Sequence, residues 1–276
     1  MPVIFLHIPK TAGSTFSALL LKLYRKYPIL DLHAIDRQYH LNYEDYFKNN
    51  AISKKKLREI VFNTTSNRRY RLVIGHEPFG IHTLFDKPST YLTFLRDPLT
   101  QIKSHYHYLA GSDLYEHKNL LQNRDFEAFI SSKYAQNFQA KYFFGDHYPN
   151  FLEKYEKGED IKPLIFDFIT KNSIQIGLTE RFNDSILYFK HILKWGNNSL
   201  QYKTINVNSQ KPKKTALNEN AVALIRANSP IDLLLYECGK SHFETQWNLF
   251  SPWKRQLTRI ADKNKQLNIL LSKTIL

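Results

Sequence analysis

The segment from Val3 to Phe16, VIFLHIPKTAGSTF, constrains the fold of this chain more than any other. Its four apolar residues from Val3 to Leu6 predict a short buried strand, which Pro9 ends. Gly13 permits a tight turn, and residues 14–16 open a helix whose first N–H groups face the loop. The segment therefore predicts a strand, a loop and a helix that hold a doubly charged, phosphate-like anion.

A lysine lies in the middle of this loop. Lys10 is expected to place its ammonium group against the anion. Hydroxyl groups and loop amides are expected to donate hydrogen bonds to the same anion, from Thr11, Ala12, Gly13, Ser14 and Thr15. The loop is not the Walker nucleotide loop, because its lysine precedes the only glycine instead of following a second one.

A second segment, Thr90 to Leu109, also predicts a strand followed by a helix (TYLTFLRDPLTQIKSHYHYL). Residues alternate along Tyr91–Leu95 as in a strand, and Asp97-Pro98 starts a helix through N-cap and first-turn preferences. Arg96 then ends the strand, and Ser104 lies about two turns into the helix. We expect both residues to converge on one phosphate.

The whole chain alternates predicted strands with longer helical stretches, which favours a parallel sheet covered on both faces. The expected strands are Val3–His7, Ile29–Ile35, Arg71–Gly75, Tyr91–Leu95, Ile174–Leu178 and Lys203–Val207. The expected helices include Ser14–Tyr27, Ser53–Ser66, Leu99–Ala110, Phe126–Ser131, Tyr134–Phe144, Arg181–Lys194, Asn218–Asn228 and Pro230–Phe250. Lys10, His76 and Arg96 each follow such a strand, at the carboxyl ends where parallel sheets bind ligands.

The two segments resemble the nucleotide-binding motifs of sulfotransferases that use 3′-phosphoadenosine 5′-phosphosulfate (PAPS). HIPKTAGSTF is similar to their 5′-phosphosulfate loop, and the Arg-Asp-Pro segment with Ser104 is similar to their 3′-phosphate-binding segment. Shorter fragments occur in the order expected for carbohydrate sulfotransferases related to the heparan sulfate 2-O- and 6-O-sulfotransferases, namely GHEPFG (75–80), NFQAKY (137–142), GLTERF (177–182) and NVN (206–208). The resemblance spans roughly residues 2 to 245.

The resemblance implies an α/β fold, a three-layer sandwich around a central parallel sheet of the P-loop-like sulfotransferase type. It implies a single domain over residues 1–276, with C-terminal helices from about residue 217 packed on it. It also implies a transferase that moves the sulfuryl group of PAPS to a hydroxyl group of a carbohydrate by in-line displacement. The nucleotide product is adenosine 3′,5′-bisphosphate.

Two residues are expected to carry the chemistry. Lys10 stabilises the charge that grows on the departing 5′-phosphate. His76 ends the strand RLVIGH and matches the base histidine of the similar 2-O-sulfotransferases, and an imidazole suits that role because its ordinary pKa is near 6.5. Glu77, His82 and His7 remain alternative bases.

Several predictions concern partners. Segment 206–214, NVNSQKPKK, either wraps the nucleotide, with Lys211, Lys213 or Lys214 near the 3′-phosphate, or is a solvated surface loop. No metal is expected, because His105 and His107 lie two positions apart on a predicted helix and point to different faces. The net charge of +14 favours anionic partners, namely a nucleotide and an acidic carbohydrate acceptor.

Two other functional classes stay open. The first is a P-loop-type kinase acting on a small molecule, which should show a Gly-Lys-Ser/Thr order and acidic residues for Mg²⁺. The second is a non-catalytic basic protein that binds polyanions or nucleic acid, although no nucleic acid is expected as a partner.

The composition also bears on localisation. The single cysteine, Cys238, cannot form an intramolecular disulfide, and no apolar run reaches the ~20 residues of a membrane span. Golgi relatives in animals carry an anchor and a stem. We therefore expect a cytoplasmic, bacterial-type enzyme, with the Golgi lumen applying only if an anchor precedes the sequence given. The oligomeric state is not predicted.

Overall fold

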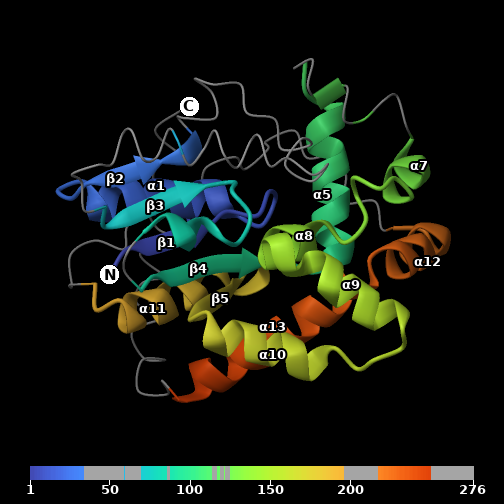
Figure 1. Cartoon of the computed structure of the whole chain (residues 1–276). Coiled ribbons are helices and arrows are strands. Elements are labelled where there is room, and N and C mark those ends of the chain that lie inside the picture. Colours follow the sequence, from blue (N-terminus) through green and yellow to red (C-terminus); the bar gives the residue numbers. More distant parts are fainter. Residues whose placement is uncertain are drawn as a thin grey trace.

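The protein is described here from a computed structural model, over residues 1–33, 59, 70–85, 88–113, 117–118, 121, 125–195 and 217–249 (Figure 1). Five parallel strands form one sheet in the order β2-β3-β1-β4-β5. The strands are β1 (Val3–Leu6), β2 (Ile29–Asp31), β3 (Leu72–Gly75), β4 (Thr90–Leu95) and β5 (Ile174–Leu178). The expected strand at Lys203–Val207 and, Glu59 apart, the expected helix at Ser53–Ser66 lie outside the described residues.

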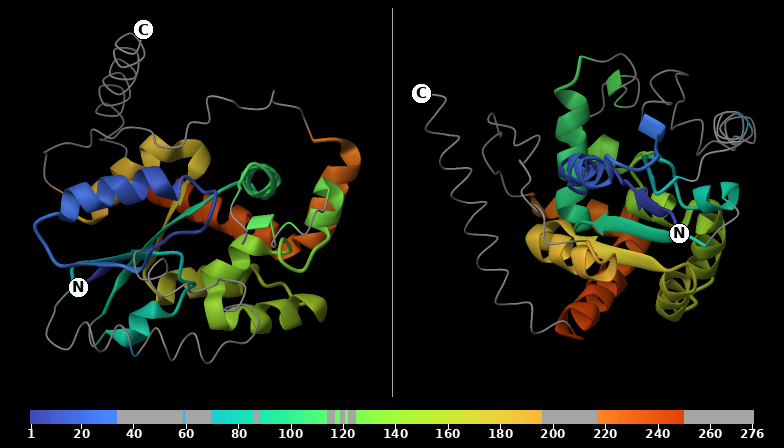
Figure 2. Two further views of the ribbon diagram at one scale, coloured as in Figure 1. Left: turned by 90° about the horizontal axis from the view of Figure 1, so that it is seen from above. Right: turned by 90° about the vertical axis from the view of Figure 1, so that its left-hand side faces the viewer.

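Helices cover both faces of the sheet (Figures 1 and 2). On one face lie α1 (Gly13–Tyr24) and α11 (Phe182–Ile192), where the ring of Phe16 contacts Phe94 and Phe189 at centroid distances of 5.1 and 5.3 Å. On the other face, α10 (Lys162–Lys171) and α13 (Pro230–Leu249) pack against β5 and against each other. The predicted three-layer α/β sandwich is therefore confirmed.

Strands β1 and β3 in the middle of the sheet are short apolar runs, VIFL and LVIG. All four residues of β1 and all four of β3 are buried, as strands in the middle of a parallel sheet with two covered faces must be. The strands pair in register, with Leu6 opposite Gly75 on one side and opposite Thr93 on the other. The carboxyl ends of β1, β3 and β4 consequently lie at one edge of the sheet.

A group of helices stands beyond that edge. Helix α5 (Pro98–Ala110) rises from the end of β4, across the direction of the strands (Figure 1). A second apolar cluster packs it against α7 (Phe126–Ile130) and α12 (Glu219–Asn228), through Ile102, Leu109, Phe129 and Ile225 among others. This packing fixes the helix that carries Ser104.

Most predicted elements are confirmed, with shifted ends. Helix α8 (Phe138–Phe144) begins four residues after the predicted Tyr134, because Asn137 takes a left-handed conformation (φ 47°) immediately before it. Strand β2 ends at Asp31, whose carboxylate accepts a hydrogen bond from the backbone N–H of His33 (3.0 Å). Helices α9 (Tyr148–Glu156) and α10 are not among the predicted elements, although both carry a proline in the first turn.

Short 3₁₀ turns complete the described part of the fold, at Ile81–Leu84, Gly145–His147 and Thr179–Arg181. Helix α13 lies on the same core as β5 and α10, while the assignment of one domain to the entire chain, with C-terminal helices from about residue 217 packed on it, stays a prediction. Within the described ranges, every helix is too short or too polar to cross a lipid bilayer.

Candidate active site

The topology of the sheet singles out one place for a ligand. Strand β1 lies between β3 and β4. The chain leaves β1 into α1 on one face, and it leaves β4 through α5 toward α8–α10 on the other face (Figure 1). Open parallel sheets bind ligands at such a switch point, outside the carboxyl ends of the strands. Arg96 lies directly after β4, and Lys10 lies in the loop that follows β1.

The loop after β1 has an uncommon backbone. Lys10 and Ala12 are both in the left-handed region, with φ of 67° and 68°, which costs of the order of 1–3 kcal/mol for each residue. Turns of this type direct successive backbone N–H groups to one side and form concave anion-binding surfaces. Between them, the buried Thr11 donates its hydroxyl proton to the carbonyl oxygen of Ile8 (2.8 Å). The Thr11 hydroxyl thus shapes the loop, instead of donating to a ligand as the sequence analysis expected.

Gly13 is needed for a different reason than the predicted one. It is not among the residues with positive φ, so the turn is made by Lys10 and Ala12. A Cβ atom at Gly13 would lie 1.8 Å from Cδ2 of His7, which is impossible without movement. Gly13 therefore makes room for a buried imidazole beneath the loop.

The same loop leads into the N-terminus of α1. Ala12 is the N-cap residue and supplies no side-chain acceptor, and the first turn of α1 contains no acidic residue. Ser14 is exposed at the start of the helix, whereas Thr15 is buried. Because the first N–H groups of a helix lack intrahelical partners and carry partial positive charge, this end favours an anion.

Arg96 joins the two predicted segments. Its Nη1 donates to the carbonyl oxygen of Lys10 (3.0 Å), and its Nε donates to Oγ1 of Thr100 (3.1 Å). The side chain of Gln101 makes a second connection, from Nε2 to the carbonyl oxygen of Pro9 (3.1 Å). The guanidinium is consequently held against the loop that contains Lys10.

One face of α5 continues from this point. Arg96, Thr100, Ser104 and Tyr108 follow at intervals of four residues, so the helical members share a face. The Lys10 Nζ lies 4.1 Å from the ring centroid of Tyr108. The half-buried Ser104 thus lies on this face between Thr100 and Tyr108, and its convergence with Arg96 on one phosphate stays a prediction.

The two cations of the site repel each other. Burial lowers the pKa of Lys10, and the positive charge of Arg96 lowers it further. Burial also lowers the pKa of Arg96, although Glu180 and Asp97 act in the opposite direction. Two cations that are partly withdrawn from water and close enough to interact favour binding of an anion between or beside them.

Side chains of the fragments NFQAKY and GLTERF form hydrogen bonds with the backbone of Arg96 and Asp97. The Gln139 side chain accepts from the Arg96 N–H (3.0 Å) and donates to the Arg96 carbonyl oxygen (2.8 Å). Glu180 accepts from the Asp97 N–H (2.9 Å) and from the Tyr236 hydroxyl (3.2 Å). Sequence reasoning identified both fragments only through the resemblance and missed what these side chains do.

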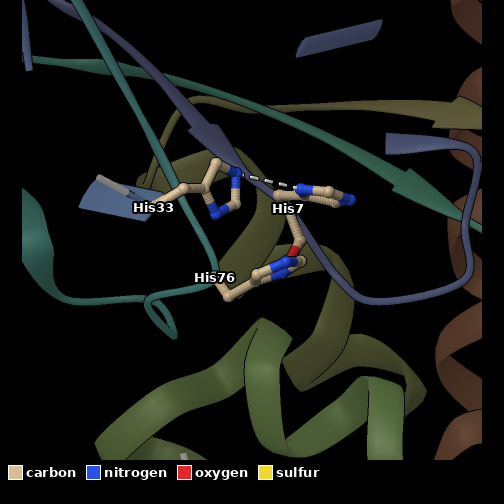
Figure 3. A group of neighbouring side chains, drawn as sticks. All are labelled: His7, His33 and His76. Atoms are coloured by element: carbon tan, nitrogen blue, oxygen red, sulfur yellow. Dashed lines mark hydrogen bonds between the residues drawn. The ribbon is translucent and has the colours of Figure 1, made fainter. Parts of the chain in front are cut away.

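His76 lies at the carboxyl end of β3, next to β1 (Figure 3). Its Nδ1 lies 2.8 Å from the carbonyl oxygen of His7 and must donate, because a carbonyl group can only accept. In the neutral ring, Nε2 then carries the lone pair. Burial, followed by the nearby His33, lowers the pKa of His76 to about 3, so the ring is neutral as a base requires.

The alternative bases are placed differently. His7 is buried with 6 % of its surface exposed, beneath Gly13, and burial followed by His76 holds its pKa well below the ordinary value. The His82 Nδ1 contacts the Tyr91 hydroxyl (2.9 Å), beside a pocket that includes Ser89 and Ser173 at the amino-terminal end of β4 and β5. His82 therefore lies away from Lys10. Glu77 is buried directly after His76 and stays an alternative base.

Three histidines meet at this edge of the sheet, from three neighbouring strands (Figure 3). One nitrogen from each of His7, His33 and His76 lies within 4.8 Å of the other two. The sequence analysis found no metal-ligating group because it compared spacings within single segments, and these residues meet only through strand pairing. His105 and His107 do point apart as predicted, since the first is buried and the second is exposed. Lys211 and Lys213 lie outside the described residues.

The mostly helical α/β structure around a central five-strand parallel sheet is consistent with the sulfotransferase fold. The chain matches the galactose-3-O-sulfotransferase family model over residues 1–269, and it belongs to that family. No curated protein matches the chain. The predictions of a carbohydrate sulfotransferase family and of a sulfotransferase enzyme are thereby confirmed.

The family corrects one prediction and leaves another open. Galactose-3-O-sulfotransferases are Golgi enzymes that act on glycans, so the expectation of a cytoplasmic enzyme is wrong. The prediction of localisation rested on cysteine content and on the length of apolar runs. These properties do not determine the compartment in which a protein acts. The likeness to heparan sulfate 2-O- and 6-O-sulfotransferases is not part of this match and stays a prediction.

Proposed function

We propose that the protein transfers the sulfuryl group of PAPS to the 3-hydroxyl group of a galactose residue in a glycan. The donor accords with the sulfotransferase family, and the acceptor follows the family's name. The observation that carries the proposal is the hydrogen bond from Arg96 to the carbonyl oxygen of Lys10, because it joins the two anion-binding segments at the switch point of the sheet.

The 5′-phosphosulfate would occupy the loop from Lys10 to Thr15. The left-handed Lys10 and Ala12 and the uncapped start of α1 supply backbone N–H groups for its oxygens, and Ser14 adds an exposed hydroxyl. The Lys10 ammonium stabilises the negative charge that develops on the bridging oxygen as the sulfur–oxygen bond breaks.

The 3′-phosphate would lie along the face of α5 marked by Arg96 and Ser104. Arg96 suits a phosphate because its planar fork donates several hydrogen bonds, and Thr100 already fixes the Nε edge of that fork. Lys211 or Lys213 is proposed as a further contact. These groups distinguish PAPS from ATP, which lacks a 3′-phosphate.

His76 is proposed as the general base. The acceptor oxygen forms a bond to sulfur while its proton passes to Nε2 of His76, and the electron pair of the broken bond leaves on the 5′-phosphate of adenosine 3′,5′-bisphosphate. The hydrogen bond from Nδ1 to the His7 carbonyl supports this role, because it fixes the tautomer and the orientation of the ring.

The first experiment compares ligands and acceptors. Adenosine 3′,5′-bisphosphate should raise the melting temperature of the protein, whereas equal concentrations of ATP and of a short RNA should raise it less. Mass analysis should then find a sulfated product from a terminal β-galactoside with PAPS, and none from the matching 3-deoxygalactoside. Stabilisation by ATP equal to that by the bisphosphate would support the kinase instead, and preferential stabilisation by RNA would support a nucleic-acid-binding protein.

A further inference from the structure

We propose that His7, His33 and His76 bind one divalent transition metal ion of the zinc type, and that the bound ion inhibits sulfuryl transfer. The inhibition rests on the proposed function, in which His76 is the base, whereas metal binding does not. The three residues follow or end the neighbouring strands β1, β2 and β3, so the paired sheet itself brings them together (Figure 3).

The spacing of the ligand atoms fits zinc. The Nδ1 of His7 lies 3.3 Å from Nε2 of His33. With zinc–nitrogen bonds of about 2.0–2.1 Å, two ligands at the tetrahedral angle lie about 3.3–3.4 Å apart. The planes of the two rings cross at 89°, with centroids 5.2 Å apart. One metal ion can therefore replace the hydrogen bond between these two side chains without a shift of the backbone.

His76 completes the set after a small rotation. Its ring now lies over His7, with centroids 4.1 Å apart and planes tilted by 32°, and must turn so that Nε2 meets the ion. Its Nδ1–H can continue to donate to the His7 carbonyl oxygen. A hydrogen bond from the second ring nitrogen to a backbone carbonyl is a usual feature of metal-binding histidines, because it orients the ring.

The chemistry of the ligands selects the kind of ion. Three imidazoles suit zinc, copper or nickel, whereas magnesium and calcium prefer oxygen ligands. Three protein ligands also leave a fourth position for water, as in open zinc sites. The positive charge of Lys10 acts on His7 and disfavours a dication, so we expect weaker binding than at a structural zinc site with thiolate ligands.

The metal and the proton of the acceptor would compete for the same atom. A metal ion on Nε2 of His76 takes the lone pair that accepts the hydroxyl proton in the proposed reaction. The loop at Lys10 and the face of α5 at Arg96 contribute no ligand to the cluster. Zinc should therefore lower kcat while leaving the affinity for adenosine 3′,5′-bisphosphate within about twofold.

The test uses the full chain without a histidine tag, after treatment with a chelator. Calorimetry should find one Zn²⁺ bound per chain and no heat from Mg²⁺. Co²⁺ as a substitute should give the intense visible absorption of a tetrahedral site. His33→Ala should weaken Zn²⁺ binding at least about tenfold. His191→Ala, which removes an exposed histidine on α11, should leave Zn²⁺ binding unchanged.

The outcomes separate the two parts of the proposal. Zinc affinity that is equal in the parent protein and in a folded His33→Ala variant, or the absence of tetrahedral cobalt bands in the parent, would overturn the metal site. Zinc binding that depends on His33 but leaves kcat unchanged would overturn the inhibition. Unaltered kcat in a metal-free His76→Ala variant would instead remove the proposed base, while calorimetry would still decide on the metal.

Discussion

The guanidinium of Arg96 donates a hydrogen bond to the carbonyl oxygen of Lys10, a residue 86 positions earlier in the chain. This contact connects the loop after β1 with the start of α5. The chain leaves β1 and β4 toward opposite faces of the sheet at this point. In the proposed reaction, one loop holds the sulfuryl end of the donor and the other holds its 3′-phosphate. Their mutual geometry thus depends on this side chain.

Arg96→Ala should weaken binding of adenosine 3′,5′-bisphosphate by about 1.5–3 kcal/mol, the value of a charge-assisted contact, or roughly 10- to 150-fold. Calorimetry measures this directly. Lys10→Ala should instead lose mainly turnover. Arg71→Ala removes an exposed arginine at the opposite end of β3 and serves as the control for charge alone. Equal affinity in Arg96→Ala and Arg71→Ala would contradict the assignment of Arg96.

Gln139→Ala should also weaken nucleotide binding, although Gln139 is expected to touch no ligand. Its amide satisfies both the N–H and the carbonyl group of Arg96, and both would lose their partner. In a double-mutant cycle with Arg96→Ala, the two losses should be clearly less than additive. Gln136→Ala is the matched control, since that amide bonds to Ser131 and Asn228 instead. Additive losses would show that Gln139 does not act through Arg96.

Gly13→Ala should destabilise the protein by about 1–3 kcal/mol, because the new Cβ would overlap the buried His7 ring. Equilibrium unfolding in urea measures the change. His7→Ala should lower the free energy of unfolding less in the Gly13→Ala background than in the parent protein, because the smaller side chain at position 7 removes the clash. Gly111→Ala is a milder control, with a nearest atom at 3.2 Å. Additive losses from Gly13→Ala and His7→Ala would contradict the proposed close packing.

Asp232 should make stability depend on pH. Its carboxylate accepts from the N–H groups of Gln139 and Ala140, yet burial raises its pKa from 3.8 to about 7. Between pH 3.8 and about 7, the Asp232 carboxyl group binds more protons in the folded protein than in the unfolded chain. The contribution of Asp232 to stability therefore falls as pH rises through this range and is constant above about 7. Urea unfolding of Asp232→Asn should show a flatter dependence over this range, whereas the exposed Asp167→Asn should not. An unchanged slope in Asp232→Asn would assign the pH dependence to other groups.

Local patterns were sufficient to predict where strands β1, β3 and β4 end, and hence that Lys10, His76 and Arg96 follow those strands. An apolar run followed by proline or by Asp-Pro determines these positions within a few residues. The same reasoning assigned the wrong role to Gly13, because the residue that requires its missing side chain, His7, approaches it only in the folded loop. Thr11 was likewise given to the ligand, whereas its hydroxyl satisfies a carbonyl group within the turn.

The unpredicted features arise from contacts between distant segments. His33 joins His7 and His76 because β2, β3 and β1 are neighbours in the sheet, an order that no single segment reveals. The two hydrogen bonds between the Gln139 side chain and the Arg96 backbone likewise join α8 to the end of β4. Helices α9 and α10 lack a strong local signal beyond a proline in the first turn and owe their place to packing on the core.

The most direct test of the account is the single-turnover rate of sulfuryl transfer by His76→Ala, measured with bound PAPS and a terminal β-galactoside in the presence of a chelator. We predict a rate about 10²- to 10⁴-fold below that of the parent protein, with unchanged affinity for adenosine 3′,5′-bisphosphate. Glu77→Gln, the neighbouring alternative, should retain most of the parental rate. A near-parental rate in His76→Ala together with a collapse in Glu77→Gln would contradict the account and assign the base to Glu77.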